Sequence, residues 1–591
     1  MVSTVDQVGS RLLFRGYGVS DSMKPIHAAL LGNDVLYLLD EVHLSEPFRQ
    51  TLAAIGGRYA NTCSGRVGEI RWAQYPLRSP FEVIEMSATP GRERDSAFRL
   101  APDDERHPVL SKRLRATKKT TLASSNSRAF VGEIEKHVKS MASEVGATIA
   151  VVVNRVATAR EVHARLSVAL KDVEVFLVTG RMRPLDRDRL EKELFPRICS
   201  GRMRDPAQRP VVVVATQCIE AGADFDFDGL VTECASLDAL RQRFGRLDRL
   251  GQCLAGARAV IVARGDTLDD DPVYGPALGA TWRWLGTASA ANGGEIDFGI
   301  RALVIPEGSN ALGLLTPRPI APILLPSHLD AWAQTSPRPT PDPDVALWLH
   351  GPERGLADVQ LVWRADLSAS LLQRAMEEEA QAASMARDVA IGLVQAVPPV
   401  SGEAMSVPFF AVKRWLEGRS ESDVADVEGA REVTDDEERQ NSDRAARSVV
   451  AWRGDASTVA LAADIKPGDT IVVPASYGGI SNGSWAPEAT DPIVDVAELA
   501  IWTQRGRAVL RLHGDVIRGL FGNATPSVPV PASAVQSANL EDRLSAITWL
   551  EQLRTDDIER DARGLLEFLR AQTGKRGIRV CLLYTSPSPR D

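Results

Sequence analysis

The sequence contains few cysteines, no long apolar run and no excess of basic residues. Six of its 591 residues are cysteines and none forms a C-x-x-C pair, which argues against a disulfide framework and a structural zinc site. No stretch approaches the ~18 consecutive apolar residues of a membrane-spanning helix, and the amino terminus lacks a signal-peptide pattern. The net charge of −9 neither indicates nor excludes nucleic-acid binding, because an acidic protein can hold a single strand in a local groove. We expect a cytoplasmic globular protein with no membrane partner.

The amino-terminal half alternates between short apolar runs and amphipathic stretches, as in parallel β–α–β units. Strands are predicted at residues 35–39, 82–86, 148–153, 173–178, 211–214, 230–232 and 259–262, and helices at residues 129–145, 157–170 and 184–199. The run at 35–39 is wholly apolar, which is typical of a parallel strand buried on both faces. A basic and polar stretch at 113–121 interrupts the pattern, so two such sheets are expected in tandem.

Beyond residue 270 the pattern weakens. Residues 317–343 are rich in proline and indicate a stiff, extended connector. Residues 367–396 indicate one long helix ended by a proline pair, and residues 421–444 an acidic linker. Residues 451–479 look rich in strand, with a turn at 466–469 before a strand at 470–473, and helix returns at 542–570.

The fold class predicted from these patterns is α/β, with two tandem parallel-sheet domains and a mixed α+β carboxyl-terminal region. The predicted layout is an incomplete first sheet domain at 1–118, a second at 119–268, a proline-rich connector at 269–350, a helical segment at 351–420, an acidic linker at 421–445, an α+β accessory domain at 446–580, and a tail at 581–591 that looks like out-of-frame translation.

Two motifs follow strands of the first predicted sheet. Asp40-Glu41-Val42-His43 supplies adjacent carboxylates, and NTP hydrolysis needs one carboxylate to hold Mg²⁺ and another to orient the attacking water. We assign Asp40 to the metal and Glu41 to the water, with both at the metal site. Ser87-Ala88-Thr89 supplies two hydroxyls that can hydrogen-bond to the carboxylate–histidine cluster. The alternatives are a solvated acidic turn and an ordinary turn.

Two further motifs lie in the second predicted sheet. In the block at 215–224, Thr216 and nearby backbone N–H groups can hold a strand phosphate, and Asp224 can contact a ribose; the alternative is a loop with a helix cap. Arg243, Arg246 and Arg249 recur every three residues, which predicts one helical face able to bind phosphate oxygens. The alternative is a solvated basic face.

Taken together, in this order, the four motifs resemble motifs II, III, V and VI of superfamily 2 helicases. That resemblance implies two RecA-like domains that sandwich ATP and Mg²⁺. It implies catalytic roles for Asp40, Glu41, His43, Ser87, Thr89, Gln242, Arg246 and Arg249, cofactor contacts for Asp224, Arg243, Arg246 and Arg249, and nucleic-acid contacts for Asn154, Arg155 and Thr216.

A narrower resemblance lies at the amino terminus. Ser3-Thr4-Val5-Asp6-Gln7, followed by Ser10-Arg-Leu-Leu-Phe14, looks like the strand-contacting region of the type I CRISPR-associated helicase–nuclease, in the variant with a carboxyl-terminal nuclease. It implies that Thr4, Asp6 and Gln7 contact nucleic acid. It also implies single-stranded DNA as substrate, an RNA-guided surveillance complex as partner, and DNA unwinding in antiviral defence.

The sequence departs from that family in two ways. It contains no G-x-x-x-x-G-K-[ST] phosphate loop, so we expect little or no ATPase activity from this chain in a malachite-green assay. Its eight histidines include no His-Asp pair, so no HD-type nuclease site is expected, and we expect a fragment truncated at both ends. Two alternatives stay open: another superfamily 2 helicase in DNA repair or RNA/DNA remodelling, and a non-catalytic nucleic-acid-binding remnant. A G-K-[ST] loop encoded upstream would favour the motor.

Overall fold

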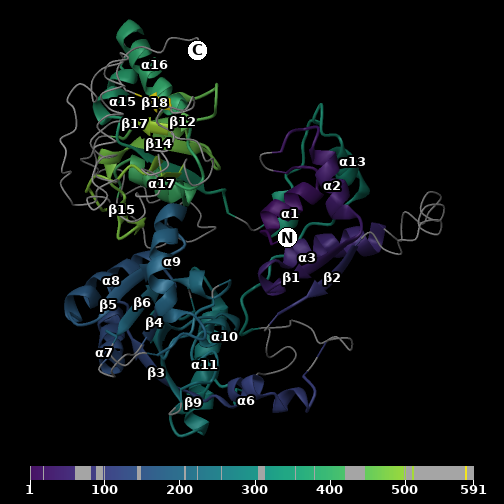
Figure 1. Ribbon diagram of the computed structural model, residues 1–591, viewed down its shortest axis with the longest axis vertical. Coiled ribbons are helices and arrows are strands. Elements are labelled where there is room, and N and C mark those ends of the chain that lie inside the picture. The colour runs from purple at the N-terminus through teal and green to yellow at the C-terminus, as the bar shows by residue number, and fades with distance from the viewer. Residues whose placement is uncertain are drawn as a thin grey trace. The chain divides into compact units, whose positions relative to one another are not determined.

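The structure is a computed structural model, and it forms two compact units (Figure 1). The first comprises residues 1–117, 234–245 and 267–355, and the second comprises residues 118–233, 246–266 and 356–591. The residues described are 2–16, 19–59, 81–87, 98, 100–142, 148–204, 208–222, 224–253, 256–269, 271–303, 313–352, 355–377, 380–419, 446–497, 499–500, 509–511 and 579–581.

The first unit is built around a pair of parallel strands. Its strands are β1 (Val35–Leu39), β2 (Phe81–Glu85) and β9 (Glu295–Asp297), and its helices are α1 (Val5–Leu12), α2 (Lys24–Gly32), α3 (Glu46–Ala53), α6 (Pro108–Arg115), α10 (Leu237–Phe244), α11 (Pro276–Ala291), α13 (Pro326–Ala333) and α14 (Ala346–His350). β1 pairs with β2 in parallel. Tyr37 and Leu39 are buried, but Leu36 is 56% and Leu38 59% exposed. The prediction that this strand is buried on both faces is therefore wrong: only alternate side chains point into the core.

The proline-rich segment after α11 packs onto this core instead of extending away from it. Trp332 of α13 and Trp348 of α14 are buried in the same cluster as Tyr37. Their rings meet edge to face, with centroids 4.9 Å apart. The hydroxyl of Thr51 donates to the carbonyl of Trp348 at 2.7 Å. The stiff, extended connector predicted from the prolines is thus incorrect, because two buried indoles hold the segment against the sheet.

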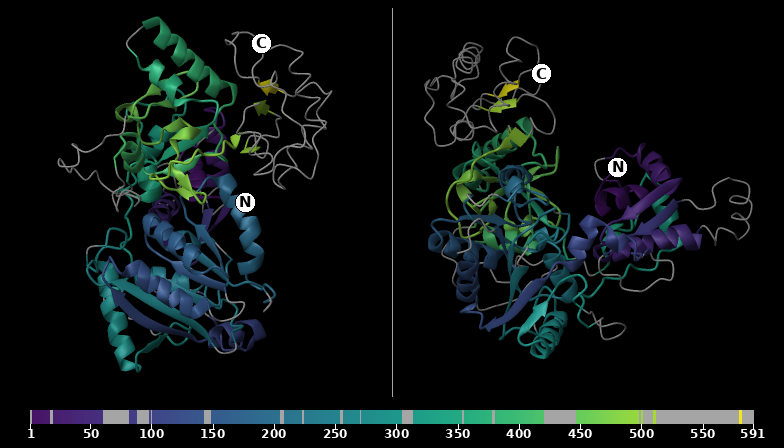
Figure 2. Two further views of the ribbon diagram at one scale, coloured as in Figure 1. Left: turned by 90° about the vertical axis from the view of Figure 1, so that its left-hand side faces the viewer. Right: turned by 60° about the horizontal axis from the view of Figure 1, so that its bottom comes forward.

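The second unit contains a larger parallel sheet. Its strands are β3 (Lys118–Ser125), β4 (Thr148–Val152), β5 (Glu174–Val178), β6 (Val211–Ala215), β7 (Gly229–Glu233) and β8 (Ala257–Arg264), in the order β5-β6-β4-β7-β8-β3, and its helices are α7 (Phe130–Ala142), α8 (Val156–Ala169) and α9 (Pro184–Ile198). Every residue of β4, β6 and β7 is buried, as the apolar runs predict. Side chains of α7 and α8 share one core cluster with this sheet, and the blue helices lie against it in both views of Figure 2. The predicted α/β class, with domains built on parallel sheets, is confirmed.

Strand β3 differs from the sequence prediction. Residues 113–121 were expected to be a polar break, but they contain the end of α6 and the first half of β3, which pairs with β8 in parallel. Lys118 and Thr120 are buried within it. Composition misleads here because a β-branched threonine and the aliphatic part of a lysine can pack on a sheet.

The rest of the second unit is an accessory module with its own sheet. Its strands are β10 (Val359–Arg364), β11 (Met405–Val407), β12 (Val449–Trp452), β13 (Thr458–Ala460) and β14 (Thr470–Pro474), in the order β11-β10-β14-β12-β13, and its helices are α15 (Ala369–Ala375), α16 (Ala380–Ala396) and α17 (Phe409–Leu416). Two short ladders follow, β15 (Ile480–Ser481) with β16 (Ser484–Trp485), and β17 (Val509–Arg511) with β18 (Arg579–Cys581).

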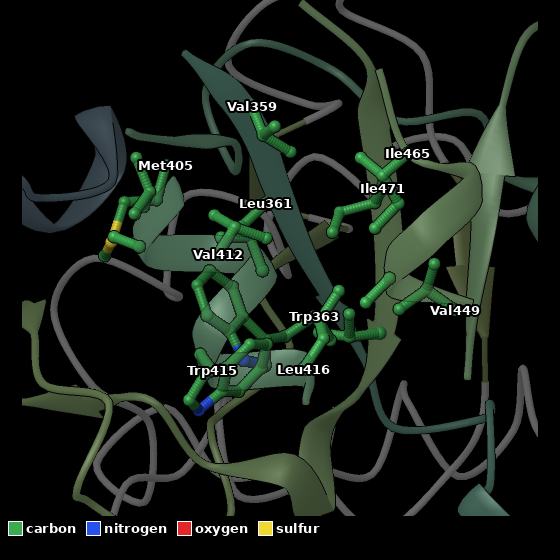
Figure 3. Packing of buried hydrophobic residues seen from close by; sticks show 14 of the residues in the cluster. Val359, Leu361, Trp363, Met405, Val412, Trp415, Leu416, Val449, Ile465 and Ile471 are labelled. Atoms are coloured by element: carbon green, nitrogen blue, oxygen red, sulfur yellow. The ribbon is translucent and has the colours of Figure 1, made fainter. Parts of the chain in front are cut away.

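The module joins segments that the sequence predicted to be separate. β10, from the expected helical segment, pairs in parallel with β14, and Trp363 and Trp415 share one core (Figure 3). The helix predicted at 367–396 is two helices, α15 and α16. The predicted turn at 466–469 is confirmed, with Gly468 at a φ of +83°. Residues 421–444, 542–570 and 582–591 lie outside the described residues, so the predicted linker, helix and tail stay predictions.

A loop of the larger sheet anchors the accessory module. The hydroxyls of Thr179 and Ser484 lie 2.7 Å apart in a buried position, and the N–H of Trp485 donates to the carbonyl of Arg181 at 2.9 Å. Arg183 donates to the carbonyl of Val494 at 2.8 Å. The loop after β5 is therefore held by the module, which fixes the two sheets of the second unit to each other. Among the described helices, none combines the length and apolarity needed to cross a membrane.

Candidate nucleotide and nucleic-acid sites

The carboxylate motif forms a tight loop at the carboxyl end of β1. Met86 donates its N–H to the carbonyl of Leu39 at 2.9 Å, and Val42 donates to the carbonyl of Met86 at 3.0 Å, which continues the pairing of the two strands. Glu41 adopts the left-handed conformation, with a φ of 46° and a ψ of 53°. A non-glycine residue in that region is strained, and such strain is concentrated at functional sites.

Side chains from three predicted motifs meet in the first unit. His43 Nδ1 lies 3.1 Å from Ser87 Oγ and 3.4 Å from Glu41 Oε2. Gln242 Nε2, from α10, donates to Glu41 Oε2 at 3.1 Å. Burial lowers the pKa of His43, and the nearby carboxylate of Glu41 partly opposes that effect. The hydrogen bond predicted between Ser87 and the cluster is thus present, whereas Thr89 lies outside the described residues.

Asp40 is the carboxylate in this loop that suits a metal. It is exposed, and its Oδ1 accepts the N–H of Glu41 at 3.1 Å. Within the part of the chain that the structure describes, no three His, Cys, Asp or Glu side chains form a metal-binding group. That arrangement still fits Mg²⁺, because Mg²⁺ is usually held by one or two carboxylates together with water and substrate phosphates. Glu41 instead directs its carboxylate to His43 and Gln242.

The three predicted phosphate-binding arginines do not share a helical face. Helix α10 ends at Phe244, and Gly245 is its cap, so Arg246 and Arg249 follow the helix. Arg243 is completely buried, and its Nη2 donates to the hydroxyl of Tyr274 at 3.0 Å. The single-face prediction is wrong because the three-residue spacing continues past the end of the helix.

Arg246 and Arg249 instead bind the neighbouring block at 215–224. Arg246 donates to the carbonyls of Ile219 at 3.1 Å and Glu220 at 2.7 Å. Arg249 Nε lies 3.1 Å from Asp224 Oδ1, and both side chains of that pair are partly exposed. Two predicted motifs of the second unit are therefore joined to each other, and neither arginine belongs to a freely solvated basic face.

The predicted nucleic-acid residues of the first unit lie at the start of α1. Thr4 is its N-cap, and its hydroxyl accepts the N–H of Gln7 at 3.4 Å. Asp6 Oδ1 lies 2.7 Å from Nε2 of His350 in α14, and the side chain of Gln7 bonds to Arg11. The structure brings these residues into one helix turn, and their acceptors are engaged within the protein.

The predicted nucleic-acid residues of the second unit lie at adjacent strand ends. Asn154 follows β4, Thr216 follows β6, and both are buried, while Arg155 is half-buried at the N-cap of α8. Gln217 Nε2 donates to the carbonyl of Asn154 at 2.9 Å, and the N–H of Asn154 bonds to Glu233 at 2.8 Å. Sequence reasoning missed Gln217 and Glu233. The position of Glu233 at the end of an apolar strand was the signal available.

Comparisons with known proteins find a family that part of the second sheet resembles. The family model for the "CRISPR-associated nuclease/helicase Cas3, C-terminal" matches residues 145–252. The CRISPR-associated nuclease/helicase Cas3 of Streptococcus thermophilus is 33% identical over 104 residues, covering 18% of this chain and 11% of that protein. The one from Methanothermobacter thermautotrophicus is 30% identical over 173 residues, covering 29% of this chain and 18% of that protein.

Among solved structures, the crystal structure of T. fusca Cas3-AMPPNP superimposes with a TM-score of 0.41 at 15% identity, over 80% of this chain and 53% of that one. The matched segments span less than a fifth of the length of the two curated relatives. The predicted resemblance is nonetheless confirmed: this chain is similar to Cas3-type superfamily 2 helicases.

Proposed function

We propose that this chain carries the greater part of an ATP-dependent DNA helicase or translocase motor, of the kind used in type I CRISPR defence. The observation that best supports this is the hydrogen bond from Gln242 to Glu41 at 3.1 Å. It joins the carboxylate motif to the Gln-Arg-rich motif, 201 residues further along the chain. An ordinary acidic turn gives no reason for a distant glutamine and a buried histidine to converge on one carboxylate.

In this proposal Asp40 holds Mg²⁺ and Glu41 orients the attacking water. Mg²⁺ bound with ATP would neutralise the charge that develops on the phosphates. Gln242 and His43 fix the orientation of the Glu41 carboxylate, and Ser87 completes that contact through His43. The strained backbone at Glu41 directs the two carboxylates differently, one to the cluster and one to the exterior.

The arginines divide into different roles. Arg249 is partly exposed and is the one we propose for contact with phosphate, whereas Arg246 supports the block at 215–224 through two carbonyls. Arg243 is buried against Tyr274 and has a supporting role. The sequence contains no G-x-x-x-x-G-K-[ST] loop, so we expect ATP turnover by this chain to stay at the buffer background.

A version of this chain joined to a segment that carries such a loop should gain DNA-stimulated ATPase activity. Asp40→Asn in that longer protein should then abolish the turnover, with DNA binding retained. Robust turnover by the chain without the loop would contradict our account of the phosphate contacts. If ATP turnover by the longer protein survives Asp40→Asn, then Asp40 is not the metal ligand and the proposed motor site is wrong.

Single-stranded DNA is the proposed substrate, held by the strand-end residues Asn154, Arg155 and Thr216. Fluorescence anisotropy with a labelled single-stranded oligonucleotide tests this across a range of salt concentrations. Arg155→Ala should weaken binding and reduce the slope of log K against log salt by about 0.7, the value for one phosphate contact to a single strand. Binding that is absent at low salt, or indifferent to Arg155→Ala, would contradict the proposed surface. The recruiting partner is proposed to be an RNA-guided surveillance complex, on resemblance alone.

A pair of glycines offers a matched steric test of the same surface. Gly180 lies in the loop after β5, beside the strand ends that carry Thr216 and Asn154, and a Cβ added there meets nothing within 4 Å. Gly286 in α11 is equally open. Gly180→Glu should weaken DNA binding by adding negative charge and bulk, whereas Gly286→Glu should leave it unchanged. Equal effects of the two substitutions would indicate only a general electrostatic influence.

A further inference from the structure

We propose that Glu233 and Arg264 are positioning residues that set the shape of the Asn154–Arg155 loop for nucleic-acid binding. This inference rests on the proposed role of that loop. Neither residue belongs to a motif that drew attention in the sequence. Both lie at carboxyl ends of strands in the larger sheet, Glu233 at the end of β7 and Arg264 at the end of β8.

Glu233 holds the backbone of the loop directly. Its side chain is buried, and its Oε2 accepts the N–H of Asn154 at 2.8 Å. β7 is the neighbour of β4 in the sheet, so a glutamate at the end of β7 reaches Asn154, the second residue after β4. A carboxylate that accepts a backbone N–H forms a stronger hydrogen bond than a neutral side chain would. The loop therefore leaves the strand in a direction that this carboxylate determines.

Arg264 balances the buried charge and extends the contact to the next helix. Its Nε donates to Glu233 Oε1 at 2.8 Å, and its Nη2 donates to Thr158 Oγ1 in the first turn of α8 at 2.8 Å. Its guanidinium also lies over the ring of Phe130, 4.2 Å from the centroid. A buried carboxylate without such a partner would be strongly unfavourable. The ion pair thus links the loop backbone at Asn154 to the first turn of α8 at Thr158.

A third side chain holds the opposite side of the same residue. Gln217 Nε2, from the loop after β6, donates to the carbonyl of Asn154 at 2.9 Å. Both backbone polar groups of Asn154 are consequently bonded to side chains, the N–H to one at the end of β7 and the carbonyl to one in the loop after β6. A loop ordered in advance loses less conformational freedom when a ligand binds. Arg155, the next residue, is therefore presented from a backbone of fixed shape.

The test compares Glu233→Met with Arg155→Ala and with the double variant, using anisotropy on single-stranded DNA. Glu233→Met should weaken binding about tenfold, since the N–H of Asn154 loses its acceptor. If Glu233 acts through the loop, the double variant should bind no worse than Arg155→Ala alone, because coupled residues give non-additive effects. Glu135→Met is the matched control: Glu135 pairs with the exposed Arg165 in the same sheet domain, and binding should not change.

Amide hydrogen exchange at Asn154 provides a readout that does not depend on DNA. Glu233→Met should accelerate exchange there, while Arg155→Ala should not. Faster exchange with unchanged DNA affinity, or additive losses in the double variant, would overturn the positioning role. An Arg155→Ala variant that binds DNA normally would instead refute the proposed function of the loop. Should Glu233→Met fail to fold, Glu233→Gln keeps the shape and one acceptor oxygen, and the same non-additivity with Arg155→Ala is expected in milder form.

Discussion

Breaking the buried ion pair of the accessory module should cause a large loss of stability. Arg364 and Glu403 are 1% and 2% exposed. Both guanidinium Nη atoms donate to the Glu403 carboxylate, one of them at 2.9 Å to Oε1, which also accepts the N–H of Val400 at 2.9 Å. Arg364 donates in addition to the carbonyl of Val397 at 3.1 Å. The pair therefore ties β10 to the segment that follows α16.

Replacing Glu403 by leucine should destabilise the module by about 3–5 kcal/mol, because it leaves a guanidinium buried without its counter-charge. The orphaned N–H of Val400 adds to this loss. The double substitution Arg364→Met with Glu403→Leu removes both charges and should recover most of the stability, since apolar replacements of a whole buried pair are often neutral or stabilising. Recovery of stability in the double variant would show that Glu403→Leu is harmful because it leaves an unpaired buried charge. A simple packing defect would not be repaired by the second substitution.

Amide exchange measured by mass spectrometry suits this test better than a melting curve, because a chain with several domains has no single unfolding free energy. In the regime of fast reclosing, about 4 kcal/mol corresponds to roughly a thousandfold faster exchange in β10 and β11. Arg453→Met is the control, since Arg453 pairs with Asp469 at an exposed site of the same module, and it should change exchange by less than about fivefold. Amide exchange that is as fast in the double variant as in Glu403→Leu alone would refute the reasoning.

Three further perturbations have expected outcomes. Burial lowers the pKa of His163, so this residue contributes stability that is present above pH ~6.5 and is lost as pH falls through the lowered folded-state pKa; His163→Gln should flatten the pH dependence of unfolding below that point. Thr179→Val should cost about 1–3 kcal/mol, measured as faster amide exchange in the loop after β5, because the Ser484 hydroxyl loses its buried partner, and Ser484→Ala added to it should cost little more. Amide exchange in the loop after β1 should be slower in Glu41→Gly than in Glu41→Ala, because a left-handed L-residue costs about 1–2 kcal/mol. Gly286→Ala should slow amide exchange in α11, with a gain in stability of about 0.5–1 kcal/mol.

The larger sheet was predictable because its strands carry their signal within a few residues. The runs at 149–153 and 211–215 are wholly apolar, and the structure buries every residue in both. A strand that is buried on both faces is recognisable from its own apolar residues, without information from distant parts of the chain. The same reasoning fails for β3, in which Lys118 and Thr120 become core residues only because β8 lies beside them.

Tertiary contacts also explain the errors downstream. Prolines at 337–343 indicate an extended chain, yet Trp332 and Trp348 lie in the core of the first unit. A local sequence pattern indicates only the preferred backbone conformation. It cannot show that two indole rings pack against core residues about 300 positions earlier in the chain. The split between the expected helical segment and accessory domain fails similarly, since β10 and β14 pair across more than a hundred residues.

The candidate site shows the same division between local and distant information. The carboxylates and the hydroxyl of Ser87 were predictable from strand ends, because parallel strands bring those ends to one edge. The contact of Gln242 with Glu41 and the contact of Glu233 with Asn154 were not predictable, because long polar side chains reach their targets across elements with no shared spacing. Spacing even misled for Arg243, where a regular interval of three crosses the helix end at Gly245. Motif letters therefore identify which groups could do chemistry, whereas the residues that hold those groups in place have to be found through burial and hydrogen bonding. Glu233 belongs to no motif, and no resemblance implied its positioning role. Testing that role therefore tests the geometry of the nucleic-acid surface alone, which substitution of a motif residue cannot do.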